Sequence, residues 1–186
     1  MELLGSLGDA ADLGLSIGSS ISKVIPTHRQ CTIELKNQSS KYTLCNPRVY
    51  MGSGRCTVPL PPSIQPDSSG EALFAKTPNT ARGSVGMFTY DLKDNSTKQC
   101  SKKIAVLFKV PFDMKLNSVE YAVGELDVSQ ECNRDLYREI SKKTNITLVS
   151  GKAKGPSLKH ESENVTILAT MSKCNTAVIK VQVSDS

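Results

Sequence analysis

Tryptophan is absent from this chain, and aromatic residues are few, with 5 Tyr and 4 Phe among 186 residues. Histidine occurs only as His28 and His160, in polar surroundings that favour surface residues over metal ligands or catalytic bases. The sequence contains no nucleophile elbow, no phosphate-binding loop and no pair of carboxylates at a catalytic spacing. It therefore predicts that the protein is not an enzyme.

Metal and cofactor motifs are also missing. The 6 cysteines include no CxxC pair, which argues against a zinc site. Their even number fits disulfides in an oxidising compartment, whereas six reduced thiols fit the cytosol, so the sequence leaves both open. Four N-x-S/T sequons favour secretion, at Asn37, Asn95, Asn145 and Asn164.

Long apolar runs are lacking as well. No run approaches the roughly 18 residues of a membrane-spanning helix, which predicts a soluble folded monomer. The N-terminus does not read as a secretory signal, because Glu2, Asp9 and Asp12 interrupt its apolar pattern. The 23 Lys and Arg against 18 Asp and Glu give a net charge of +5, which suits an anionic or zwitterionic surface. No basic cluster is interleaved with aromatics, so nucleic acid is not a predicted partner.

After Pro26, most of the sequence has the pattern of short strands. In "CTIELKN", Cys31, Ile33 and Leu35 alternate with polar residues, and similar runs recur between Gly, Pro, Asn and Ser clusters. This pattern predicts a single, mainly β domain, a sandwich or barrel. "SQECNRDLYREISKKT" predicts one short helix near residues 130–143 with Ser129 as its N-cap, and "GKAKGPSLKHESEN" predicts an exposed loop.

Residues 2–25 keep an amphipathic helical period over more than six turns, roughly 36 Å at 1.5 Å per residue. Four glycines within this stretch each cost a helix roughly 1 kcal/mol relative to alanine. A terminal helix of this kind usually packs on its own domain; a segment that detaches and re-forms in lipid would also use the glycines. The apolar face contains Leu3, Leu4, Leu7, Ala10, Ile17, Ile21 and Val24, and the polar face contains Glu2, Asp9 and Asp12.

At "ARGSVGMFTYDL" and "IAVLFKVPFDMKLNS" the chain resembles the actinoporins, the sea-anemone pore-forming cytolysins, and more closely their divergent relatives outside cnidarians. The resemblance implies a β-sandwich flanked by two α-helices, with a membrane-inserting amphipathic segment at 1–28 and the sandwich at 29–186. It also implies a monomer that docks on a lipid membrane, forms a homo-oligomer and inserts its N-terminal helix. The resulting pore would prefer cations, because its lumen would carry the acidic face.

The resemblance also implies docking residues. Ser53, Val85, Pro111 and Tyr137 keep the family's residue types, and Phe112 keeps the aromatic after Val-Pro. Tyr121 is a further candidate membrane anchor, and Leu116 of the same region could insert into lipid, as could Met114; all three could equally pack on their own domain.

The family's sphingomyelin site depends on a Tyr and Trp cluster that this sequence has largely lost. Lys109, Leu116 and Asn117 stand where the family has a serine, a tryptophan and a tyrosine, and Ser141 and Lys142 replace helix tyrosines. A quaternary ammonium needs aromatic faces and is repelled by lysines, so the sequence favours an anionic lipid, a glycan or a protein receptor.

Two alternatives stay open. The chain could be a lectin-like or lipid- or receptor-binding module on the same sandwich that makes no pore. It could also be a cytosolic protein that associates with internal membranes, rather than a secreted one that acts on a target-cell membrane.

Overall fold

The computed structural model describes residues 29–144 and 147–186. The predicted inserting helix, with its apolar and acidic faces, lies outside these residues, as do His28 and Asn145. Within the described residues, no helix is both long and apolar enough to cross a bilayer.

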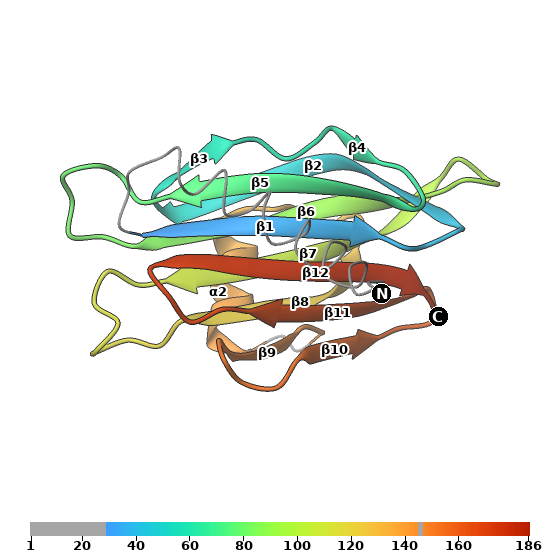
Figure 1. The fold of residues 1–186 in the computed structure, drawn as a ribbon. Coiled ribbons are helices and arrows are strands. Elements are labelled where there is room, and N and C mark those ends of the chain that lie inside the picture. The colour runs from blue at the N-terminus through green and yellow to red at the C-terminus, as the bar shows by residue number, and fades with distance from the viewer. Residues whose placement is uncertain (1–28, 145–146) are drawn as a thin grey trace, which may run out of the picture.

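Two six-stranded sheets pack face to face (Figure 1). The first has the order β10-β11-β12-β1-β5-β3, and the second has the order β4-β2-β6-β7-β8-β9. The strands of the first sheet are β1 (Gln30–Asn37), β3 (Arg55–Val58), β5 (Ser68–Ala75), β10 (Leu158–Glu161), β11 (Val165–Met171) and β12 (Thr176–Asp185). Those of the second are β2 (Tyr42–Ser53), β4 (Ser63–Ile64), β6 (Ser84–Asp94), β7 (Cys100–Val110), β8 (Glu120–Asp127) and β9 (Val149–Lys152). The predicted mainly β sandwich is confirmed.

The core between the sheets follows the predicted alternation. Cys31, Ile33 and Leu35 are buried on the inner face of β1. Phe74 of the first sheet meets Phe108 of the second, with ring centroids 4.8 Å apart. Because side chains alternate between faces with period two, each strand delivers every second residue to this core.

The two ends of the sandwich differ. β1 pairs in parallel with β12 and antiparallel with β5. The connections between strands lie at the two opposite ends of the sheets (Figure 1). We call the end formed by residue 54 and the loops 76–83 and 111–119 the loop end. The turn end is formed by the connections 38–41 and 95–99 and by the C-terminus.

The predicted helix exists as α2 (Arg134–Lys142), but it begins later than expected. Asn133, not Ser129, is the N-cap, and its side-chain oxygen accepts from two backbone N–H groups of the first turn. Ser129 instead donates its hydroxyl to Asp127 at 2.7 Å, within the turn that follows β8. Asn is as good an N-cap as Ser, and the Ser129 hydroxyl is engaged in its local hydrogen bond to Asp127 instead.

α2 covers the outer face of the second sheet. Its buried residues Leu136 and Ile140 pack against Met87, Leu107 and neighbouring outward side chains of the sheet. Both faces of the second sheet are therefore apolar over part of their length. A smaller cluster beneath the helix supplements the main core.

The stretch predicted as an exposed loop, residues 151–164, is partly strand, so that expectation is wrong. β9 ends within it and β10 follows. Leu158 lies so close over Gly151 that a Cβ there would meet its Cδ2 at 2.9 Å. His160, expected at the surface, is half-buried, and its Nε2 accepts from the Glu125 backbone N–H at 3.3 Å. β10 lies at the edge of its sheet. Because an edge strand needs only one apolar face, its sequence is largely polar and resembles a loop.

The cysteines and the sequons, on which the predicted localisation depends, differ in how deeply they are buried. All six cysteines lie within the described residues as free thiols, and Cys31 is buried whereas Cys56 and Cys174 are exposed. Asn37 is fully buried, and its amide donates to the carbonyls of Tyr42 and Ile64. This sequon therefore has no surface asparagine to carry a glycan, which removes part of the argument for secretion.

Candidate functional site

One row of side chains crosses the second sheet at the loop end. The strand register places Ser53 beside Val85, Val85 beside Lys109, Lys109 beside Glu120, and Glu120 beside Lys152. Directly paired residues point to the same side of a sheet, so the row lies on the outer face, the one that carries α2. Two predicted docking residues, Ser53 and Val85, are neighbours in this row.

A hollow of about 250 Å³ lies where this row meets α2. Its floor includes the rings of Tyr50 and Tyr137, whose centroids are 5.4 Å apart and whose planes are tilted by 41°. Tyr137 also packs over Gly52, where a Cβ would lie 3.7 Å from the ring. The lining residues are Tyr50, Gly52, Ser53, Val85, Arg134, Tyr137 and Arg138.

A second hollow, of about 450 Å³, adjoins the first on the other side of Ser53. The Ser53 hydroxyl donates to the Gly83 carbonyl at 3.0 Å and so ties the end of β2 to the loop 76–83. Gly83 itself permits no side chain, because a Cβ there would lie 2.0 Å from the Val110 carbonyl oxygen. The lining residues are Gly52, Ser53, Ala81, Arg82, Gly83, Pro111, Phe112, Asp113 and Asn117.

Arg29 holds the loop 111–119 in place. Its guanidinium donates to the Phe112 carbonyl from Nε at 2.9 Å and from Nη2 at 2.6 Å, and to the Pro111 carbonyl from Nε at 3.1 Å. The Arg29 Cζ and the Lys76 Nζ each lie 5.4 Å from the centroid of the Phe112 ring. Two cations therefore flank an aromatic side chain that is still 42% exposed.

The tip of the loop 111–119 presents an apolar side chain to solvent. The Asp113 carboxylate accepts from the backbone N–H groups of Lys115 and Leu116 at 2.8 and 3.2 Å, which closes a turn. Leu116 beyond it is 82% exposed. Met114, the other apolar candidate of this loop, is half-buried and packs against the core. Only Leu116 of the two is available at the surface.

Tyr121 does not belong to this surface, so its prediction as a membrane anchor is wrong. The side chain is 2% exposed, and its hydroxyl donates to the Ala169 carbonyl at 3.2 Å across the core. Burial raises the pKa of this phenol. β8 carries apolar residues on both faces, because α2 covers its outer face, and the sequence therefore could not say which face Tyr121 occupies.

Sequence reasoning missed three residues of the site: Tyr50, Arg134 and Arg138. Arg134 and Arg138 lie one helical turn apart and flank Tyr137, a spacing that places all three on neighbouring positions of one helix surface. The sequence carried this signal in "RDLYR". Tyr50 had no such signal, because only the second sheet's packing brings β2 beneath α2.

The sequence is similar to proteins of one family along nearly its whole length. A sequence model described as sea anemone cytotoxic protein matches residues 2–184. DELTA-actitoxin-Aas1a of Anthopleura asiatica is 29% identical over 146 residues, 75% of this chain and 63% of the relative. Bryoporin of Physcomitrium patens is 30% identical over 122 residues, 65% of each chain. The matches thus span slightly less than two thirds of these relatives.

A solved structure shares the fold. The lipid binding protein Nakanori aligns with a TM-score of 0.73 at 10% identity, over 93% of this chain and 79% of its own. At this identity the likeness concerns the sandwich alone. Because the family match extends over almost the entire sequence, the chain belongs to the sea anemone cytotoxic protein family, as a divergent actinoporin-like member.

Proposed function

We propose that this protein is a pore-forming cytolysin. It docks on a lipid membrane through the loop end, assembles there as a homo-oligomer and inserts residues 2–25 as amphipathic helices. Glu2, Asp9 and Asp12 then face the lumen, where carboxylates favour cations. We further propose that it is secreted and acts on the membrane of a target cell.

The observation that carries this proposal is the composition of the loop end. Phe112 and Leu116 are two of the four large hydrophobic side chains exposed among the described residues, and both lie on one loop there. Beside them are two hollows, one with a tyrosine pair as its floor. Exposed apolar groups next to amphipathic Tyr and basic side chains are the composition of an interfacial membrane anchor.

Dye release from lipid vesicles tests the proposal. We would compare the intact chain with a form lacking residues 1–25 and with the double variant Ile17→Asp/Ile21→Asp, which places charges on the apolar face. The matched control, Ser16→Asp/Ser19→Asp, adds the same two charges to the polar face. We expect release by the intact chain and the control only, with vesicle binding retained in all four.

Release by the truncated form would exclude insertion of residues 2–25 as the mechanism. Binding to vesicles or glycans without release from any composition would instead support the module that makes no pore. Chemical cross-linking of the vesicle-bound protein measures homo-oligomer formation independently of dye release.

A further inference from the structure

Two arginines at the site form no ion pair with the acidic residues that the structure describes. Arg134 and Arg138 are exposed on consecutive turns of α2 and line the hollow of about 250 Å³. None of the ion pairs formed among residues 29–144 and 147–186 includes either residue. Asp135 precedes Arg138 by three positions, a spacing at which helical side chains can meet, but the described ion pairs do not join them. The hollow is therefore flanked by two guanidinium groups that form none of the described ion pairs.

Two more basic residues lie near the hollow. Lys109 lies two strands from Ser53 in the row across the second sheet, between Val85 and Glu120, and Arg82 lines the adjoining hollow. The nearest carboxylate of that hollow, Asp113, already accepts two backbone hydrogen bonds. A trimethylammonium group would thus meet cations here, with one tilted tyrosine pair in place of an aromatic cage.

We propose that this hollow binds the phosphate of an anionic phospholipid headgroup, with Arg134 and Arg138 as its ligands. The planar guanidinium presents paired N–H donors that match phosphate oxygens. Tyr50 and Tyr137 pack against the apolar part of the lipid, and the Arg82 side of the surface faces the neighbouring headgroups. This inference rests on the proposal that the loop end docks on a membrane, and it names the class of lipid.

Vesicle flotation with the full chain tests the assignment. The vesicles contain phosphatidylcholine alone, phosphatidylcholine with sphingomyelin, or phosphatidylcholine with phosphatidylserine. The variant Arg134→Gln/Arg138→Gln is compared with Lys98→Gln/Lys102→Gln, which removes the same charge at the turn end. We expect the site variant to lose about 30-fold in partitioning onto phosphatidylserine vesicles, since each basic residue near an anionic surface contributes about fivefold. The control should lose less than threefold, because its lysines lie beyond the Debye length of about 10 Å from the docked surface.

Three results would overturn the proposal: equal losses in the two variants, an unchanged site variant, or a wild-type preference for sphingomyelin. A third variant, Arg134→Lys/Arg138→Lys, keeps the charge but loses the planar fork, and we expect it to recover only part of the binding. Complete recovery of partitioning would mean that net charge alone, and not the guanidinium geometry, accounts for binding, and would also overturn the proposal. Flotation measures docking without dye release, so failure of pore formation and failure of this site remain distinguishable.

Discussion

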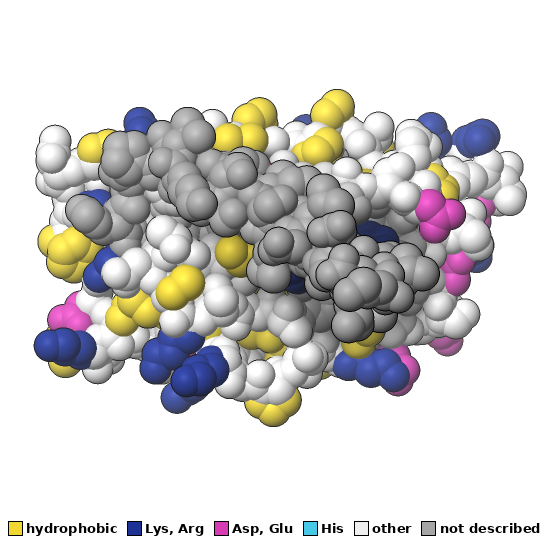
Figure 2. Space-filling model, in the orientation of Figure 1, with side chains coloured by type: hydrophobic (Ala, Val, Ile, Leu, Met, Phe, Trp, Pro, Cys, Tyr) yellow, Lys and Arg dark blue, Asp and Glu magenta, His cyan; other side chains and the backbone are white. Residues whose placement is uncertain are grey.

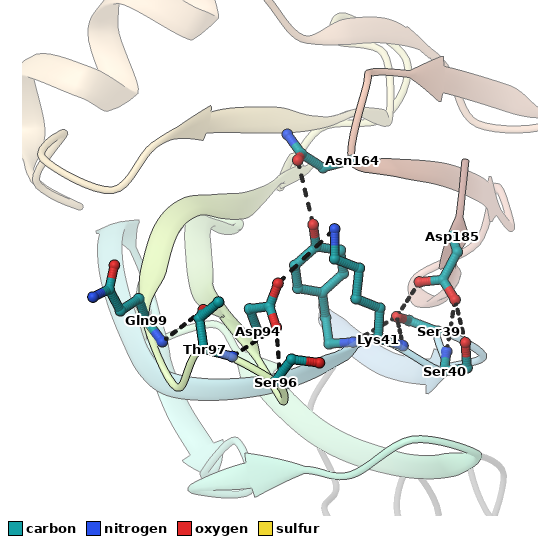
Figure 3. A network of polar contacts seen from close by, with 10 residues as sticks. Ser39, Ser40, Lys41, Asp94, Ser96, Thr97, Gln99, Asn164 and Asp185 are labelled. Carbon is teal, nitrogen blue, oxygen red and sulfur yellow. Dashed lines mark hydrogen bonds and ion pairs between the residues drawn. The ribbon is translucent and has the colours of Figure 1, made fainter.

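The two ends of the sandwich differ in how their charged side chains are paired. At the turn end, the Asp185 carboxylate accepts from the Ser39 hydroxyl and from the backbone N–H and hydroxyl of Ser40 (Figure 3). Asp94 accepts from two backbone N–H groups, and Lys41 lies 3.9 Å from it. At the loop end, Arg82, Arg134 and Arg138 take part in none of the described ion pairs.

The surface view shows a difference in the acidic side chains. On the face shown in Figure 2, Lys and Arg side chains are visible at both ends, whereas most of the visible Asp and Glu side chains lie toward the right, the turn end. Groups that pair within the protein stabilise the fold, whereas unpaired charges and exposed apolar side chains gain their interactions from a partner. The comparison supports the proposal that the loop end docks on a membrane, whereas the paired groups of the turn end stabilise the fold.

The largest expected effect comes from the shape of the loop end. Gly83→Ala places a Cβ 2.0 Å from the Val110 carbonyl oxygen, so the loops 76–83 and 111–119 must move apart. We expect a loss of about 2 to 3 kcal/mol in the free energy of unfolding, measured by urea denaturation. Gly52→Ala in the same surface meets only ordinary contacts at 3.6 Å or more and should cost less than about 1 kcal/mol. Equal losses would mean that the close approach at Gly83 is not a constraint.

The next effect separates binding from stability. Leu116→Ala removes a side chain that is 82% exposed, so the free energy of unfolding should change by less than about 0.5 kcal/mol. Partitioning onto vesicles should fall about tenfold, because a leucine buried in lipid contributes about 1.5 to 3 kcal/mol and alanine retains part of it. Val49→Ala, at a residue 38% exposed on β2, is the matched control and should leave partitioning unchanged. A similar fall in partitioning for both variants would contradict the proposal that the loop end docks on the membrane.

The smallest effect concerns the turn end and its pH dependence. Burial alone raises the pKa of Asp185, but hydrogen bonds from Ser39 and Ser40 outweigh it, and the net pKa is lowered. The stabilisation is therefore complete above the unfolded value of about 3.9 and is lost as pH falls through the lower folded value. Asp185→Asn should cost about 1 kcal/mol at neutral pH and less in acid, by denaturation at both pH values.

The control for this variant is Asp67→Asn, which removes a carboxylate that accepts no hydrogen bond among the described residues and should cost little at either pH. Membrane partitioning should stay at the wild-type level in both variants. A binding defect in Asp185→Asn would contradict the division of roles between the two ends.

Much of the fold was predictable because strands and caps leave local signals. The alternation in "CTIELKN" identified the buried face of β1, and the pattern of "SQECNRDLYREISKKT" identified the helix α2. The prediction began the helix too early, because the Ser129 hydroxyl donates to Asp127 and Asn133 caps the helix instead. The strand β10 was missed because an edge strand carries half the usual apolar signal.

The candidate site was predictable only in part. Ser53, Val85, Pro111, Phe112 and Tyr137 lie together at the loop end, around two adjoining hollows. Tyr50 belongs to the site because β2 packs against α2, a segment far away in the sequence. Tyr121, which was predicted to belong to it, is buried in the core. No local pattern encodes either outcome.

The sequence by itself determined the strand periodicity, the short helix, the charge balance and the family, because these depend on residue order and spacing along the chain. Only the tertiary structure decided which apolar face became the core and which side chains met at the loop end. A period of two assigns residues to alternate faces without naming the buried one, and the second sheet is apolar on both. Cross-strand register then brought Ser53, Val85 and Lys109 into one row and set it beneath the arginines of α2.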